Sequence, residues 1–323
     1  MKKDLEAAAN WIKSTTGSDK YTISPLRQEA SSRSYYRIIT DDQSYILAIQ
    51  SKDAPEKNSA ASGSSPAKFL YAAKLLGNNS VRVPEIYAFS EDLRFMLQED
   101  LGDITLDSHK ELDNRLVLEQ ALDQLALIYS VDQDVLKAFS YDDLFEQTSN
   151  FLTIYEYRNV SLNKNEINAI HALRKKLVEL IMEQPFLPTH NDFERRNFIY
   201  FKEQIHIIDF QDLNVGPMGM DLASLLYEHD FDYPKDLIDE LLQKHCERNA
   251  LGFDAKHADI LIKQVLTHRS MRCVALLNDY NKQGKLLNRK NDILTGMTEI
   301  ASICFVPIDF IITVCCLLYT SDA

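Results

Sequence analysis

The sequence predicts an α+β fold with two lobes, in which a small antiparallel β-sheet with one main helix precedes a larger, mostly helical lobe. Strand-like runs of β-branched and aromatic residues fill the chain from about Tyr21 to Glu99. Further along, apolar residues recur at three- and four-residue spacing, which is typical of helices that bury one face. The chain has 323 residues, which is long enough for both lobes to have a core.

The first lobe is expected to cover residues 1–100. It opens with an amphipathic helix whose acidic residues argue against a signal peptide, so we expect a cytoplasmic location. The expected strands are 35–39, 44–49, 83–88 and 94–98, with one helix near 67–76. The stretch 51–66 is rich in Ser, Ala and Pro and is either a simple connector or a lid over the substrate.

The second lobe is expected to cover residues 101–315, after a hinge at 100–103. The expected helices are 112–129, 141–157, 166–182, 220–229, 235–248 and 257–280. Near the end of the chain, Pro307 and Asp309 interrupt an apolar stretch that is then too short to span a membrane. Residues 316–323 resemble the in-frame translation of a sequencing adapter, so we expect this tail to be non-native.

Charge and cysteine content narrow the possible partners. The formal net charge of -13 argues against nucleic acid or an anionic membrane as partner, because the electrostatic interaction would be repulsive. A small-molecule substrate is the better expectation. The five cysteines have no metal-type spacing and are expected to be reduced thiols.

The centre of the chain contains the residues with the clearest chemistry. Asp192 is followed by Asn197 and, twelve residues after that, by Asp209. Two short runs of β-branched and aromatic residues, 198–201 and 205–208, flank a polar turn and predict a hairpin. Such a hairpin returns Asp209 to the side of Asn197.

This spacing fits the transfer of a phosphoryl group. In the kinase pattern H-x-D-x-x-x-x-N, the Asp orients or deprotonates the acceptor hydroxyl, while the Asn and a later Asp hold the magnesium that bridges the phosphates. Here the catalytic role falls on Asp192 and the metal-binding role on Asn197 and Asp209. These residue types also favour turns and hairpin ends, but their joint spacing favours the functional interpretation.

A kinase also needs groups that hold the phosphates of ATP. The segment 28–37 stands where a glycine-rich loop is expected, yet it contains no glycine. Its small residues allow the backbone to approach phosphates, although a plain polar hairpin explains the segment equally well. The third strand ends in Gln50 where a kinase carries a lysine, and Lys52 is the nearest cation, either on phosphate or in solvent. The nucleotide-binding candidates here are Ser31, Ser32, Arg33, Ser34 and Lys52.

Three more polar residues lie near these segments. His190 is expected to pack and to hydrogen-bond within the loop, and Asp221, at the start of a helix, is expected to support the backbone of that loop. Asp212 is either a further ligand of metal or substrate or a solvated acid in a turn.

These residues resemble the aminoglycoside phosphotransferase and choline kinase-like superfamily, and within it the bacterial branch of anomeric kinases of N-acetylmuramate and N-acetylglucosamine. The resemblance covers most of the chain. The matching segments are 31–37, 53–57, 83–86, 99–103, 141–144, 208–212, 216–217 and 221–226. The Asp-Phe-Gln-Asp form of residues 209–212 is the more specific mark of the branch.

The resemblance implies a protein-kinase-like fold that uses ATP and Mg²⁺. It implies that Asp192 is the base, that Asn197 and Asp209 hold magnesium, and that the backbone from Glu99 to Leu101 meets adenine. The branch also lacks the strand-three lysine. The implied reaction phosphorylates the anomeric hydroxyl of N-acetylmuramate or N-acetylglucosamine in cell-wall sugar recycling.

Two departures from the branch leave the acceptor open. Asn191 stands where the branch usually carries a basic or small residue, and 51–66 is longer and richer in serine than expected. An aminoglycoside, choline or a hydroxy amino acid is therefore an alternative acceptor. The non-enzymatic alternative is a kinase-like protein that binds nucleotide without turnover, motivated by the glycine-free loop and the missing lysine.

Overall fold

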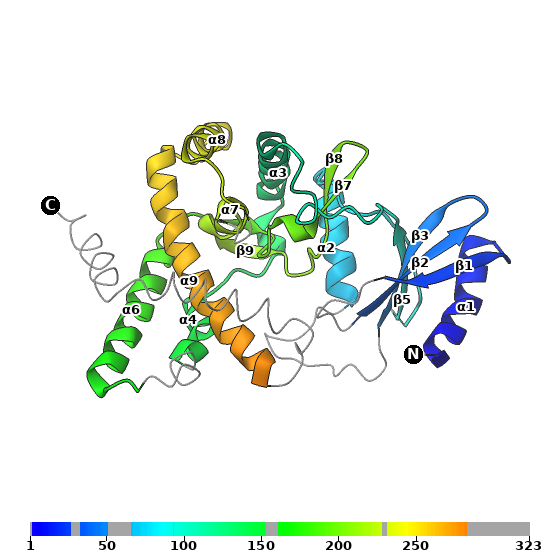
Figure 1. Ribbon diagram of the computed structural model, residues 1–323, viewed down its shortest axis with the longest axis horizontal. Coiled ribbons are helices and arrows are strands. Elements are labelled where there is room, and N and C mark those ends of the chain that lie inside the picture. The colour runs from blue at the N-terminus through cyan, green and yellow to red at the C-terminus, as the bar shows by residue number, and fades with distance from the viewer. Residues whose placement is uncertain are drawn as a thin grey trace. The chain divides into compact units, whose positions relative to one another are not determined.

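The computed structural model describes the chain except for residues 1, 27–32, 51–65, 93, 153–160, 228–230 and 283–323 (Figure 1). It confirms the predicted α+β fold, with an antiparallel sheet and a mostly helical remainder. The chain divides into two compact units, one formed by Met1–Leu136 and Pro188–Asn214, the other by Lys137–Leu187 and the chain from Val215 onwards. The lobe boundary near residue 100 and the non-native tail at 316–323 stay predictions.

The first unit contains a five-stranded antiparallel sheet with the order β1-β2-β3-β5-β4. Its strands are β1 (Tyr21–Pro25), β2 (Arg33–Thr40), β3 (Ser44–Gln50), β4 (Ile86–Phe89) and β5 (Phe95–Glu99). For three of the four predicted strands, both ends lie within two residues of the ends observed in the structure. The fourth begins only at Ile86, because Pro84 has no N–H to donate to a ladder. The strand β1 lies at the edge and is mostly exposed, so its burial pattern has no alternation.

Alternating side chains give this sheet two different faces. On one face, Leu47 and Leu97 pack with Ala8 and Ile12 of α1 (Lys2–Thr16) in a buried core. Figure 1 shows α1 lying against the sheet. The amphipathic N-terminal helix is thereby confirmed.

The opposite face of the sheet carries the residues that alternate with this core. Arg37 in β2 pairs with Ile46 in β3, which pairs in turn with Gln98 in β5. Ala48 and Met96 form the next pair along the same strands. This face therefore presents both polar and apolar side chains beside the end of β5.

Two helices of the first unit precede residues 188–214 and help to hold them in place. The first, α2 (Pro66–Asn78), begins with a proline, whose missing N–H costs nothing at a helix start. The second, α3 (Asn114–Tyr129), begins two residues later than predicted, because the side chain of Asp113 accepts from the N–H groups of Arg115 and Leu116.

The predicted hairpin is confirmed by strands β7 (Phe198–Phe201) and β8 (Gln204–Ile207). Lys202 and Glu203 form its turn with φ values of 49° and 62°, which match the twist of a two-residue hairpin. The side chain of Gln120 in α3 donates to the Glu203 carbonyl at 3.1 Å and accepts from the Ile205 N–H at 2.9 Å. The hairpin is thus fixed to α3.

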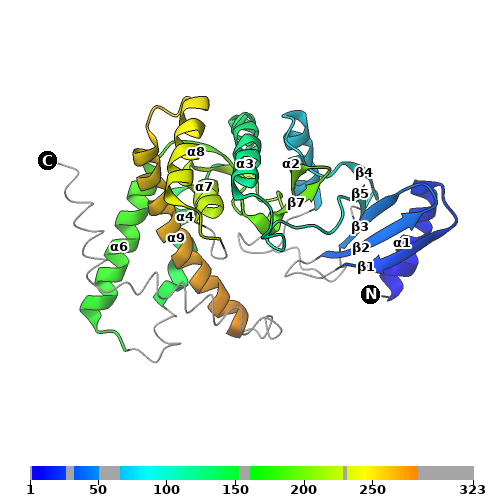
Figure 2. The ribbon, with the colours of Figure 1, turned by 45° about the horizontal axis from the view of Figure 1, so that its top comes forward.

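The second unit is mostly helical. Its helices are α4 (Tyr141–Gln147), α6 (Lys164–Met182), α7 (Gly219–Leu226), α8 (Lys235–Arg248) and α9 (Ala255–Lys282). The helices α6, α7 and α8 all contact α9 (Figure 2). The predicted helix 141–157 is interrupted, because α4 ends at Gln147 and a short 3₁₀ turn, Ser149–Leu152, follows. Residues 153–157 of that prediction lie outside the described residues.

Several short elements were not predicted. Strands β6 (Phe186–Thr189) and β9 (Asn214–Pro217) pair with each other, and 3₁₀ turns cover Gln133–Val135 and Arg195–Asn197. Each is only three or four residues long, too short for a periodic pattern. Among the residues that the structure describes, no helix is long and apolar enough to cross a membrane.

Candidate active site

The loop after β6 is held by His190 and Asn191. The N–H of Asp192 donates to Nδ1 of His190 at 3.3 Å, and Nε2 of His190 bonds to the Ile208 carbonyl at 3.0 Å. Both bonds are satisfied when the ring is neutral with its hydrogen on Nε2. Asn191 has a φ of 78°, a conformation that asparagine tolerates better than most residues. This geometry supports a structural role for His190.

The hairpin brings the two predicted metal ligands together. The N–H of Ile208 donates to the Asn197 carbonyl at 2.9 Å, one residue before Asp209. The side-chain Nδ2 of Asn197 donates to the Asp192 carbonyl at 2.8 Å. Asp192, Asn197 and Asp209 therefore lie at one place in the first unit, as the spacing predicts.

The carboxylate of Asp212 belongs to the same group of residues. Nδ2 of Asn191 donates to the Asp212 carbonyl, which ties the loop after β6 to the segment after Asp209. Burial raises the pKa of the Asp212 carboxyl, and the nearby charges of Asp209 and Asp192 raise it further, while Lys68 of α2 opposes them. The site thus contains three neighbouring carboxylates and a cation from α2.

These side chains fit a bound magnesium ion. Asn197 uses its nitrogen to bind Asp192, so its Oδ1 stays available and accepts from no residue in the described part of the chain. Asp209 is exposed, and among the described residues only its Oδ1 is bonded, by Nε2 of Gln211 at 2.7 Å. In the described ranges no three His, Cys, Asp or Glu side chains form a ready metal cluster. Magnesium needs only one or two protein ligands when phosphates and water supply the rest.

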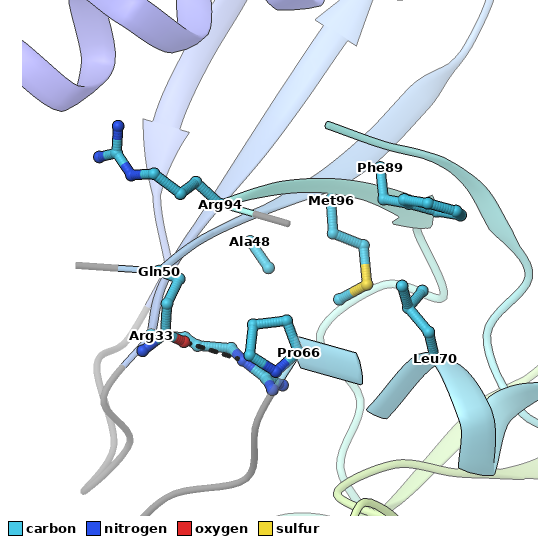
Figure 3. A pocket seen from close by; sticks show the side chains of 8 residues that line it. All are labelled: Arg33, Ala48, Gln50, Pro66, Leu70, Phe89, Arg94 and Met96. Atoms are coloured by element: carbon cyan, nitrogen blue, oxygen red, sulfur yellow. Dashed lines mark hydrogen bonds between the residues drawn. The ribbon is translucent and has the colours of Figure 1, made fainter. Parts of the chain in front are cut away.

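Arg33 lies at the start of β2, directly opposite Gln50 at the end of β3. Its Nε donates to Oε1 of Gln50 at 3.4 Å (Figure 3). Its guanidinium group also lies over the ring of Phe69 in α2, 4.9 Å from the ring centre. Arg33 is 4% exposed. A buried cation therefore stands at the strand end where a kinase carries its lysine.

Phe69 connects the Arg33 side chain to the segment that contains Asp209. Its ring packs against that of Phe210, with the centroids 4.6 Å apart, and Phe210 directly follows Asp209. A small pocket opens on the Arg33 side of α2 (Figure 3). Its lining residues are Arg33, Ala48, Gln50, Pro66, Leu70, Phe89, Arg94 and Met96. In Figure 3 the guanidinium group of Arg94 points away from that of Arg33.

The predicted hinge follows the end of β5. The side chain of Glu99 accepts from the Glu85 N–H at 3.2 Å and so is turned toward the segment before β4. Leu101 is 3% exposed, and within the described part of the chain its N–H donates to no acceptor. Gln98, the residue before the hinge, has a buried Oε1 that likewise has no partner in these parts of the chain. The hinge therefore offers polar groups to a ligand.

The remaining predicted residues do not all join this site. Ser31, Ser32 and Lys52 lie outside the described residues. Ser34 alternates with Arg33 along β2 and so lies on the opposite face of the sheet. Asp221 is fully buried in α7, and its support of the loop backbone stays a prediction.

Sequence reasoning missed Lys68 and Phe69 of α2, and the ion pairs of Arg37 with Asp100 and Asp103. No local pattern identifies them, because each contact joins positions far apart in the chain. The only available signal was that Arg37, Asp100 and Asp103 fall inside the segments that carry the superfamily resemblance.

Known proteins and one protein family are similar to this chain. A sequence model described as "Phosphotransferase enzyme family" matches residues 22–255. An N-acetylmuramate/N-acetylglucosamine kinase of Neisseria meningitidis serogroup B is 22% identical over 247 residues, 74% of this chain and 71% of that protein. A protein of the same name from Pseudomonas aeruginosa is 28% identical over 228 residues, 69% of this chain and 65% of that protein.

Solved structures show the same fold. The crystal structure of the aminoglycoside phosphotransferase APH(2'')-Ib with ADP bound has a TM-score of 0.62 and 17% sequence identity. The match covers 92% of this chain and 99% of that chain. At this identity the similarity supports the kinase-like fold and leaves the acceptor undecided.

Proposed function

We propose that this chain, which belongs to the phosphotransferase enzyme family, transfers the γ-phosphoryl group of ATP to the anomeric hydroxyl of N-acetylmuramate or N-acetylglucosamine. Two of the similar proteins are named for kinases of these sugars, and they match about seven tenths of this chain. The proposal narrows the family's general activity to one class of acceptor, the N-acetyl amino sugars. It also places the reaction in cytoplasmic cell-wall sugar recycling, where ATP is available as donor.

On the acceptor side, Asp192 is the proposed base. An anomeric hydroxyl is more acidic than an ordinary alcohol, so a carboxylate needs only to orient it and to take its proton late. Asp192 is half-buried, and its backbone is fixed at the N–H by His190 and at the carbonyl by Asn197. The rigid backbone would hold the carboxylate in one position relative to the acceptor.

On the donor side, Asn197 and Asp209 are the proposed metal ligands. A bound magnesium ion would offset the negative charge that develops on the transferring phosphoryl group. Asn197 presents its Oδ1 because its nitrogen is occupied, and Asp209 presents a carboxylate at the end of the hairpin. Asp212, whose pKa is raised by burial and by its two neighbours, would become easier to ionise once a cation is bound.

For the rest of the nucleotide, we propose contacts along the face of the sheet opposite α1, which carries Arg37, Ala48 and Gln98. Arg33 of β2 supplies a cation opposite the end of β3, with Ser31, Ser32 and Lys52 as further phosphate-binding candidates. The carbonyl of Glu99 and the N–H of Leu101 are the proposed adenine contacts. These two groups lie at the end of β5, beside the apolar Ala48 and Met96.

The observation that carries the proposal is the bonded arrangement of Asp192, Asn197 and Asp209 in a chain of this family. Initial rates with radiolabelled ATP, measured across N-acetyl amino sugars, aminoglycosides, choline and hydroxy amino acids, test it. We expect transfer to the amino sugars at much higher kcat/KM than to the others. Preferred transfer to another class would refute the acceptor. Magnesium-dependent binding of ATP without transfer to any of them would favour the non-enzymatic alternative.

A further inference from the structure

Arg37 joins two carboxylates of the segment that follows β5. Its Nε and one terminal nitrogen donate to Asp100 at 2.7 and 2.9 Å. Its two terminal nitrogens also donate to Asp103, both at 2.7 Å. The guanidinium group is thus bidentate toward both acids, the geometry that only arginine provides. We call Arg37, Asp100 and Asp103 the hinge clamp.

The hinge clamp fixes the backbone between its two acids. Asp100 also accepts from the Gly102 N–H at 3.0 Å, and Gly102 has a φ of 84°, which most other residues would resist. Beyond it, the Thr105 N–H donates to the Asp103 carbonyl at 3.1 Å. The segment is therefore a defined turn whose shape depends on the position of the Asp100 side chain.

The position of the clamp relates it to the nucleotide. Arg37 lies on the same face of the sheet as Gln98, with Ile46 of β3 between them. Leu101, whose N–H has no acceptor in the described residues, stands between the two acids of the clamp. A small rotation of this turn would move that N–H out of the plane of a bound purine.

Charge gives a second reason for an arginine at this position. Asp100 is nearly buried, since its side chain is 6% exposed. Burial acts to raise its pKa, yet the pKa is lowered overall by the bonds from Arg37 and the Gly102 N–H. Without Arg37, two neighbouring acids would repel each other within the turn. The single positive charge of Arg37 offsets one of the two negative charges, and the bonds to both acids raise the pKa of Arg37 in turn.

We propose that Arg37 is a positioning residue for the purine base, which acts by holding Asp100 and Asp103 so that the Glu99 to Leu101 backbone presents its hydrogen-bonding groups. This inference rests on the proposed function. It assigns Arg37 a role in the affinity for the base of the nucleotide, with no direct contact to the reacting atoms.

The test compares Arg37→Met and Arg37→Lys with the wild type and with Arg115→Met. The control removes an arginine that pairs with Glu119 on the exposed surface of α3. We expect Arg37→Met to raise KM for ATP about tenfold, with kcat and the KM of the acceptor within about twofold of wild type. Arg37→Lys restores only part of the affinity, because lysine keeps the charge but loses the forked geometry.

Calorimetry with adenosine and with magnesium tripolyphosphate separates the base from the phosphates. Arg37→Met should weaken adenosine binding by the same factor as ATP binding and leave tripolyphosphate binding unchanged. Equal losses of affinity for adenosine and tripolyphosphate would show a general structural defect and overturn the inference. An adenosine affinity equal to that of the wild type would overturn it as well. If the wild-type protein binds tripolyphosphate and shows no preference for ATP or adenosine over it, that result would instead refute the proposed function itself.

Hydrogen exchange on the nucleotide-free proteins tests the clamp without any ligand. We expect faster exchange of the Gly102 and Thr105 amides in Arg37→Met and unchanged exchange in Arg115→Met. Unchanged exchange at both amides would overturn the inference, because the turn would then not depend on Arg37.

Discussion

Asp192, Asn197 and Asp209 owe their proximity to backbone groups. The Asn197 carbonyl accepts from Ile208, and the Asp192 carbonyl accepts from the Asn197 side chain. Neither bond uses a carboxylate oxygen. Substitution of Asp192 or Asp209 should therefore change the chemistry of the site while leaving the loop and the hairpin in place.

We predict that Asp192→Asn lowers kcat by about 10² to 10⁴, the usual contribution of a positioned proton-transfer group. The affinity for MgATP should stay within about twofold, because Asp192 acts on the acceptor. Initial rates and calorimetry measure the two quantities. Turnover near the wild-type rate would remove Asp192 from the catalytic role.

We predict that Asp209→Ala abolishes the magnesium dependence of ATP binding, because it removes the charged member of the proposed metal pair. Calorimetry with ATP, in the presence and absence of magnesium, measures the effect. Glu91→Ala is the matched control, since it removes an exposed carboxylate from the turn before β5. If Asp209→Ala binds MgATP as tightly as this control, the metal site lies elsewhere.

We predict that the contribution of the hinge clamp to stability depends on pH. The bond from Arg37 lowers the pKa of Asp103. At Asp100, burial acts to raise the pKa, but the bonds from Arg37, the Gly102 N–H and Ser44 together lower it overall. A lowered folded-state pKa gives stability that is complete above about pH 4 and is lost as the pH falls further. Arg37→Met should therefore reduce the free energy of unfolding by about 1–2 kcal/mol at pH 7.

Urea unfolding of wild type and Arg37→Met at pH 7, 5 and 3 checks this prediction. The difference between the two proteins should be similar at pH 7 and 5 and smaller at pH 3. A difference that stays constant down to pH 3 would show that Arg37 stabilises through packing alone.

At the scale of elements, local periodicity predicted the hairpin well but misplaced the end of α4. Residues 198–201 and 205–208 contain nearly the whole of β7 and β8, because their β-branched and aromatic residues flank a polar turn. In α4, the carbonyl of Phe145 accepts from Arg174 at 2.9 Å and from the Thr148 hydroxyl at 3.0 Å. These bonds occupy the carbonyl that the next helical turn would use. The partner lies 29 positions away, so no local pattern shows it.

The packing of α7 against α9 gives a prediction with a matched control. A Cβ atom on Gly219 would lie 3.0 Å from the Leu261 carbonyl oxygen and 3.0 Å from Cγ2 of Val265. We expect Gly219→Ala to lower the free energy of unfolding by about 1–3 kcal/mol, because the backbone of α9 cannot yield easily. Gly77→Ala in α2 meets nothing within 4 Å and should instead stabilise by about 0.5–1 kcal/mol.

Chemical denaturation of both glycine variants measures these changes. A neutral or stabilising Gly219→Ala would mean that α7 and α9 are less closely packed than described. A destabilising Gly77→Ala would mean that α2 is not a regular helix at that position.

At the scale of the whole molecule, the sequence predicted the fold class and the proximity of Asp192, Asn197 and Asp209, but not the tertiary contacts around them. The spacing of Asp192, Asn197 and Asp209 was sufficient because a hairpin is a local structure. The hinge clamp joins positions 63 and 66 residues apart, and the Phe69 to Phe210 contact is longer still. Such contacts depend on tertiary packing, which a single sequence does not reveal.

The same limit applies to the acceptor. Motifs for phosphate and metal chemistry are shared across the family, whereas the acceptor is selected by the shape of its pocket. The two named relatives are 22% and 28% identical to this chain, which supports the family more directly than the sugar. The acceptor therefore has to be determined from the product.

Phosphorus NMR of the product formed from MgATP and N-acetylglucosamine or N-acetylmuramate tests the central claim most directly. Asp192 is proposed to orient the anomeric oxygen, so we predict a sugar 1-phosphate and no product from the 1-O-methyl glycoside, in which that oxygen carries no proton. A 6-phosphate, or equal turnover of the methyl glycoside, would contradict the anomeric mechanism.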